Sequence, residues 1–192
     1  DNITLLGYRA FGQSTSHQSA LSNYLSALTN TGNFASLPVI RIEIKNSNFD
    51  KIVEKRNQAL IKGILVKTDQ DAVSAKVLHN GNDFNASIRL KGDWVHHLEH
   101  EDKWSFRVKL NGENSLFDMR EFSIQHPKQR EFQSEPLFYL MLNDFEIITP
   151  RHFFVKVLIN NTNIGIMALE EHFSDEMLEN NNRERSVILK YN

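Results

Sequence analysis

The sequence predicts an α+β fold, in which a mostly antiparallel sheet of five or more strands packs against one long buried helix. Several short runs alternate apolar and polar residues, which is typical of half-buried strands. Turn-forming residues such as Asn80-Gly81 separate two of these runs and predict a hairpin. The segment 134–145 is apolar on most sides, which indicates a buried helix.

The chain is predicted to divide into an N-terminal arm, residues 1–37, and an α+β domain, residues 38–191. The arm is rich in Ser, Asn, Thr and Gln, although 19–28 has a leucine-lined face that fits a short helix. In the domain, Pro38 precedes an alternating strand from Val39 to Lys45. A helix follows, capped by Asn48 or Asp50, which runs to about Lys62 and is closed by Gly63.

The middle of the chain is predicted to be strand-rich. The hairpin pairs Val73–Val77 with Phe84–Leu90 through a type I′ turn, which needs positive φ at both central residues. The next predicted elements, in chain order, are strands Trp104–Leu110 and Glu121–Gln125, the helix Ser134–Phe145, strands Phe153–Ile159 and Ile164–Ala168 around a turn at Asn160–Asn163, a helix Ser174–Asn180, and a final strand or hinge Ser186–Tyr191.

Composition excludes several classes of function. With 22 basic and 24 acidic residues the net charge is −2, so no basic footprint for nucleic acid exists. No apolar run approaches 18 residues, which excludes a transmembrane helix in this chain. Cysteine is absent, which excludes disulfides and thiolate chemistry.

Four pieces of the C-terminal half occur in a suggestive order. They are the turn Arg89-Leu-Lys91-Gly92-Asp93, the strand Lys103-Trp-Ser105-Phe106-Arg107, the hairpin Ile159–Gly165 and the exit Leu169-Glu170-Glu171. This series resembles the front half of the CotH-type (spore coat protein H-like) atypical protein kinase family, over about 88–191. Two departures are that Trp94-Val-His96-His97 replaces the family's Ser-rich continuation and that Asn161 replaces a usual Gly.

The resemblance implies a kinase-like small lobe at about 70–191, the N-terminal part of an enzyme that transfers the γ-phosphoryl of ATP to Ser or Thr of a protein substrate. Such transfer uses Mg²⁺, whose Asp or Asn ligands are expected beyond the end of this chain. The fragment alone is therefore expected to be inactive. The resemblance also favours an extracytoplasmic location, either periplasmic or at the cell surface.

The resemblance implies the following candidate site residues for the nucleotide. Lys103 would hold the phosphates, with Arg107 as second choice, and Glu135 would orient the lysine. Gly92 would let backbone approach phosphate closely, and Glu170 would lie at the hinge between lobes. Each has a plainer explanation: a solvated strand face, the favourable N-terminus of a helix for Glu135, a simple turn and an ordinary hairpin exit.

Two other functions stay open. A non-enzymatic binding or structural module of a surface or coat assembly is the alternative, and it predicts scattered candidate residues with an exposed apolar patch elsewhere. A third class is a metal site at His96, His97 and His100, close in sequence to three carboxylates, although a solvated loop also explains this polar segment. A kinase lobe instead predicts that Lys103 and Gly92 converge near Glu170.

Overall fold

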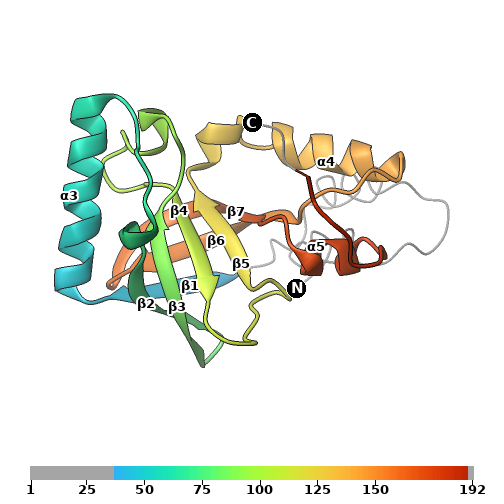
Figure 1. Ribbon diagram of the computed structural model, residues 1–192, viewed down its shortest axis with the longest axis horizontal. Coiled ribbons are helices and arrows are strands. Elements are labelled where there is room, and N and C mark those ends of the chain that lie inside the picture. Colours follow the sequence, from blue (N-terminus) through green and yellow to red (C-terminus); the bar gives the residue numbers. More distant parts are fainter. Residues whose placement is uncertain (1–36, 190–192) are drawn as a thin grey trace, which may run out of the picture.

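Seven strands form a closed barrel in the order β1-β2-β3-β4-β5-β7-β6 (Figure 1). This computed structural model describes residues 37–189. Neighbouring strands are antiparallel, except that β1 runs parallel to β6 and so closes the barrel. The strands are β1 Val39–Ile44, β2 Val73–His79, β3 Asn82–Leu90, β4 Phe106–Leu110, β5 Glu121–Gln125, β6 His152–Ile159 and β7 Thr162–Glu171.

The helices lie outside the barrel. Helix α3 stands along one side of it, and α4 and α5 lie on the other side (Figure 1). Phe49 of α3 stacks on Trp104 with 5.9 Å between ring centroids, which fastens this helix to the barrel. The helices are α3 Asn46–Lys62, α4 Ser134–Asp144 and α5 Asp175–Asn180, with short 3₁₀ turns η1 Asp69–Asp71, η2 Val95–His97 and η3 Pro127–Arg130.

The side chains that fill the barrel come from alternate positions of every strand. Successive strand residues point to opposite faces, so one set of each strand faces inward. These inward residues are almost wholly apolar and fully buried, which makes their burial the main favourable contribution to folding. Examples from six strands are Ile42, Val77, Ile88, Phe106, Val108, Phe122, Ile124 and Val157.

Several predicted elements are present where the sequence placed them. Asn80 and Gly81 have φ of 49° and 81°, as the type I′ hairpin requires. Gly63 adopts φ 78° and ends α3 in the left-handed conformation. In the β6–β7 hairpin, Asn160 and Asn161 have φ of 47° and 66°, so asparagine supplies both left-handed positions there.

The predicted fold class is wrong. The α+β sheet with a packed long helix, and with it the kinase-like small lobe, is replaced by the closed barrel. The helix at 134–145 was expected to be buried, but α4 buries only Pro136 and Leu140. Phe138, Met141 and Phe145 are 55%, 48% and 74% exposed. The barrel interior is already filled by its own strands, so no open sheet face remains for this helix to cover as its core.

Smaller expectations also change. Residues 186–189 form no strand, and Trp104 precedes β4 rather than belonging to it. The helix predicted at 19–28 lies outside the described residues, as does the predicted arm apart from Leu37. Over the described part of the chain, no helix combines the length and apolar character that crossing a membrane requires.

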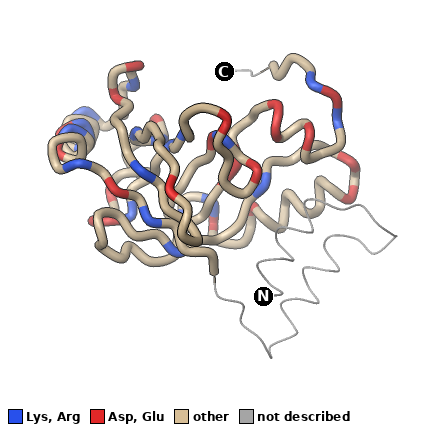
Figure 2. The backbone as a smooth tube through the Cα atoms, turned by 90° about the horizontal axis from the view of Figure 1, so that it is seen from below, with Lys and Arg blue, Asp and Glu red and all other residues tan. Residues whose placement is uncertain are grey.

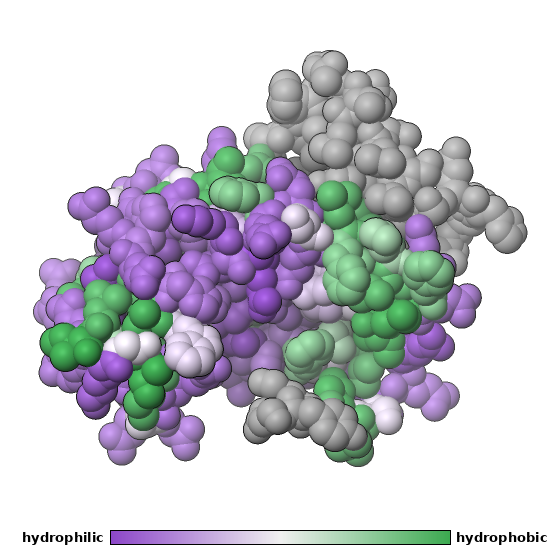
Figure 3. Space-filling view, turned by 90° about the horizontal axis from the view of Figure 1, so that it is seen from above, coloured by the Kyte–Doolittle hydropathy of each residue, from purple (hydrophilic) through white to green (hydrophobic). Residues whose placement is uncertain are grey.

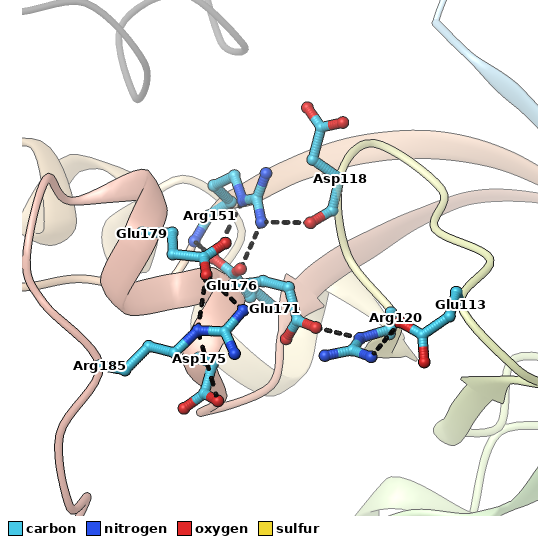
Figure 4. Close-up of polar contacts among 9 residues, drawn as sticks. All are labelled: Glu113, Asp118, Arg120, Arg151, Glu171, Asp175, Glu176, Glu179 and Arg185. Atoms are coloured by element: carbon cyan, nitrogen blue, oxygen red, sulfur yellow. Dashed lines mark hydrogen bonds and ion pairs between the residues drawn. The ribbon is translucent and has the colours of Figure 1, made fainter.

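A buried ion pair closes one end of the barrel interior. The Arg151 guanidinium binds the Glu171 carboxylate through Nε at 3.0 Å and through Nη2, and the two side chains are 4% and 0% exposed (Figure 4). The remaining donors of Arg151 reach the carbonyl oxygens of Phe117 and Asp118 at 2.8 and 3.0 Å. Every donor group of this guanidinium thus has an acceptor, which is the condition for burying a charge without a large cost.

We expect Arg151→Met to destabilise the fold by about 3–5 kcal/mol, because Glu171 would stay buried without its partner. The free energy of unfolding is measured by urea titration. Arg151→Met/Glu171→Leu should recover a large part of the loss, since it removes both charges together. A single variant as stable as the wild type would contradict this role of the ion pair.

Candidate functional site

A row of polar side chains crosses the outer face of five adjacent strands. Residues directly opposite one another in register are Arg89 on β3, Arg107 on β4, Ser123 on β5, Glu170 on β7 and His152 on β6. All have the parity opposite to that of the apolar residues filling the barrel. Nevertheless Ser123 and His152 are buried, because other segments cover this outer face.

A lysine joins the row from the end of β3. The Lys91 ammonium lies 2.9 Å from Gln125 Oε1 and 3.5 Å from Glu170 Oε2. The Gln125 amide also donates to Glu170 Oε2 at 2.8 Å, so the three side chains form a closed triangle. We define the outer polar layer as six of these residues: Lys91, Arg107, Ser123, Gln125, His152 and Glu170.

Helix α4 and the η3 turn lie next to this layer. Tyr139 of α4 packs on the His152 ring with 6.1 Å between centroids. Glu135 at the start of α4 places Oε2 3.5 Å from His152 Nε2, and its Oε1 accepts a hydrogen bond from Tyr139 at 2.8 Å. Arg130 at the end of η3 reaches Glu135 Oε1 with its Nε at 3.4 Å. We call η3 and α4 the cover. Contacts between charged side chains thus link this cover to the outer polar layer.

Burial shapes the protonation of this layer. Desolvation lowers the pKa of Lys91, and the neighbouring Glu170 offsets this only in part. Burial alone would raise the pKa of Glu170, but Lys91, Arg130 and His152 together hold it below its usual value. For Glu135 burial prevails and raises the pKa. The Lys91 ammonium is therefore incompletely compensated, and a further anion beside it would be favourable.

Several buried polar atoms of the layer have no hydrogen-bond partner. They are Nε and Nη1 of Arg107, Oγ of Ser123, both ring nitrogens of His152, and Oε2 of Glu135 in the cover. Arg107 Nη1 lies 3.8 Å from Glu121, and His152 Nε2 lies 3.5 Å from Glu135, within ion-pair range but beyond a well-formed hydrogen bond. Buried polar groups are nearly always satisfied, so these atoms leave hydrogen-bonding capacity for water, an ion or a ligand.

Gly92 fixes the loop that follows Lys91. Its φ is +105°, and a Cβ there would lie 2.4 Å from the His97 ring. His97 Nδ1 in turn contacts Ser105 Oγ at 3.1 Å, and burial lowers the pKa of His97 to about 4. Only glycine fits this position, so Gly92 serves a tight turn that brings a neutral imidazole against the end of β3.

The structure separates the residues that the resemblance grouped. The Lys103 ammonium reaches the Ile166 carbonyl at 3.4 Å, beside Gly165, and the predicted Lys103–Glu135 pair is not formed. Glu170 is paired with Lys91 instead. Arg107 does belong to the outer polar layer, and Gly92 directly follows Lys91. The expected convergence at Glu170 thus involves Lys91 rather than Lys103.

The histidines of the predicted metal site are divided between two places. The His96 ring lies 4.4 Å from His97, whereas His100 lies 4.9 Å from His126. His100 Nδ1 accepts from the backbone N–H of Lys103. Within residues 37–189, no group of three His, Cys, Asp or Glu side chains is arranged to hold a metal ion.

Sequence reasoning missed Lys91, Gln125, Ser123, His152 and Arg130 as site residues. A usable signal was present, because each strand member has the parity opposite to its apolar neighbours. Parity alone, however, does not tell a solvated outer face from one covered by η3 and α4.

No protein-family model matches the chain, and no curated protein matches it either. Figure 2 shows basic and acidic residues interspersed along the described chain, in keeping with the net charge of −2. The outer polar layer is thus a local arrangement of charge and not part of a broad basic surface.

Acid should destabilise the fold through His152, whose pKa burial lowers from 6.5 to about 4. Between these two pH values His152 is protonated in the unfolded chain but stays neutral in the folded chain. Stability is therefore lost as pH falls from about 6.5 towards 4. For His152 this loss is on the order of 3 kcal/mol. We expect urea titrations at several pH values to show a shallower acid loss in His152→Gln. Parallel curves for the two proteins would contradict this.

Proposed function

We propose that the outer polar layer binds a phosphate-bearing ligand, with Lys91 as its main contact. The observation that carries this proposal is the state of Lys91. Its side chain is only 14% exposed, and the ammonium is held between Gln125 and Glu170, yet it has three N–H donors for these two partners. Such an ammonium is a positioned point charge, which is what binding phosphate oxygens requires.

The neighbourhood suits this role. Arg107 lies in the same layer with two guanidinium nitrogens that lack acceptors. Phosphate oxygens accept several charge-assisted hydrogen bonds at once, so they match a set of unsatisfied donors. Glu170 keeps Lys91 in place, in the way that a carboxylate orients the phosphate-binding lysine of phosphoryl-transfer enzymes. These contacts support the proposal through chemistry rather than through the overall fold.

We further propose that this site contributes to phosphoryl transfer of the CotH type, which the sequence resemblance implies but the barrel fold does not support. The γ-phosphoryl of ATP would pass to a Ser or Thr hydroxyl of a protein substrate, with loss of the hydroxyl proton and release of ADP. The donor set of the outer polar layer fits phosphate. It does not fit Mg²⁺, because the described residues offer no converging group of metal ligands, so no step is assigned to that ion.

A binding or structural module is the second candidate, and one observation favours it. Helix α4 exposes Phe138 and Met141, and Phe145 and Ile147 continue the exposed apolar surface beyond its end. Figure 3 shows hydrophobic side chains gathered on the side where α4 lies in Figure 1. Exposed apolar patches of this kind are typical of surfaces that contact other proteins.

We expect calorimetric titration with Mg²⁺ and ATP to give saturable binding that Lys91→Gln abolishes or weakens about tenfold or more, since a charge-assisted hydrogen bond is lost. Lys103→Gln is the matched control and should bind as the wild type does. Lys91→Arg should retain part of the affinity, because it keeps the positive charge. Thermal melting checks that each variant is folded.

Two other outcomes of this titration would contradict the role of Lys91. Loss of binding in Lys103→Gln alone would restore Lys103 as the phosphate contact. Absence of ATP binding by the wild-type chain would contradict the proposal and favour the binding module.

The chain is expected to show no phosphotransferase activity, because its described residues offer no converging group of ligands for the Mg²⁺ that such transfer uses. Incubation with γ-labelled ATP, Mg²⁺ and a mixture of Ser- and Thr-containing peptides tests this. Label transfer that depends on Mg²⁺ and is lost in Lys91→Gln would overturn the prediction. Lys109→Gln, which removes an exposed lysine of β4, controls for the loss of one charge.

A further inference from the structure

Arg130 is an exposed cation at the edge of the outer polar layer. It ends the η3 turn, which starts two residues after Gln125, the last residue of β5 and a partner of Lys91. Its side chain is 45% exposed, whereas that of Lys91 is 14% exposed. Contacts link the two cations: Arg130 reaches Glu135, Glu135 reaches His152, and His152 lies opposite Glu170, the partner of Lys91. Arg130 and Lys91 therefore belong to the same part of the barrel surface, at different depths.

The contact between Arg130 and its partner Glu135 is weak. Arg130 Nε lies 3.4 Å from Glu135 Oε1, and that oxygen already accepts a shorter hydrogen bond from Tyr139 at 2.8 Å. Solvent reaches the Arg130 side of this pair, which weakens it, although Glu135 is only 13% exposed. Glu135 would keep the Tyr139 donor if Arg130 turned away, which offsets part of the cost.

We infer that Arg130 is a second anion-binding residue of the Lys91 site, and that a ligand with two adjacent phosphate groups draws it away from Glu135. This inference rests on the proposed function and specifies its ligand class as one containing a diphosphate. One phosphate lies at Lys91 and the next at Arg130, whose planar guanidinium forms paired hydrogen bonds with phosphate oxygens. A single phosphate at Lys91 leaves Arg130 on Glu135.

Glu135 then competes with the ligand for the Arg130 guanidinium. Glu135→Gln keeps an acceptor for the Tyr139 hydroxyl but removes the charge that holds Arg130. It also removes a carboxylate that would repel the incoming ligand. Affinity for a diphosphate therefore rises in this variant, although a residue on the site itself has been changed.

The experiment measures the affinities of the full 192-residue chain for inorganic phosphate and for pyrophosphate by calorimetric titration. We expect the wild type to bind pyrophosphate at least tenfold more tightly than phosphate. Arg130→Gln should lower pyrophosphate affinity far more than phosphate affinity and so remove this preference, and Glu135→Gln should raise pyrophosphate affinity severalfold. The double variant should resemble Arg130→Gln, because the effect of Glu135 passes through Arg130.

Lys109→Gln, which removes an exposed cation on β4, is the control and should leave both affinities unchanged. Equal affinity for the two anions, or an unchanged preference in Arg130→Gln, overturns the inference. If ATP binds through Lys91 while pyrophosphate shows no advantage over phosphate, only this inference fails. If ATP, phosphate and pyrophosphate all fail to bind the wild type, the proposed function fails with it.

Discussion

Closure of the sheet by the parallel pairing of β1 with β6 is the constraint on which the rest of this structure depends. Ile40 lies opposite Val157 and Ile42 opposite Ile159, so residues more than a hundred positions apart form one ladder. The β6–β7 turn strengthens this contact, because Asn160 donates its backbone N–H to Ile42 and its side chain accepts from Ile44 at 2.7 Å. A closed sheet has no edges, and each strand then has one inward and one outward face.

The outward face explains why charge is buried here. Once apolar residues have filled the interior, polar residues of the other parity must lie outside, and the η3 turn and α4 then cover part of them. Covering charges is costly unless they are paired. Lys91 with Glu170 and Arg130 with Glu135 meet this requirement only in part, and several donors of Arg107 and His152 lack acceptors. A ligand that supplies acceptors and negative charge would complete the layer.

The sequence allowed the strands and turns to be predicted, but not how they assemble. Asn80-Gly81 and the alternating runs carry local signals, which depend on backbone conformation and on the period of two. Closure depends on a pairing between distant strands, for which no local pattern exists. The same limit affected the site: Lys103 shares the alternation of Arg107, but β4 begins only at Phe106, so Lys103 lies beyond the strand and its ammonium reaches Ile166.

Two consecutive carboxylates on β7 show how location decides role. Glu171 points inward and meets Arg151, each of whose guanidinium nitrogens has an acceptor in this carboxylate or in one of two carbonyl oxygens. This pair therefore serves stability. Glu170 points outward and shares its oxygen between Gln125 and Lys91, beside donors that have no acceptor. Identical side chains one residue apart thus differ in what they leave unsatisfied, and only the outer one leaves binding capacity for a ligand.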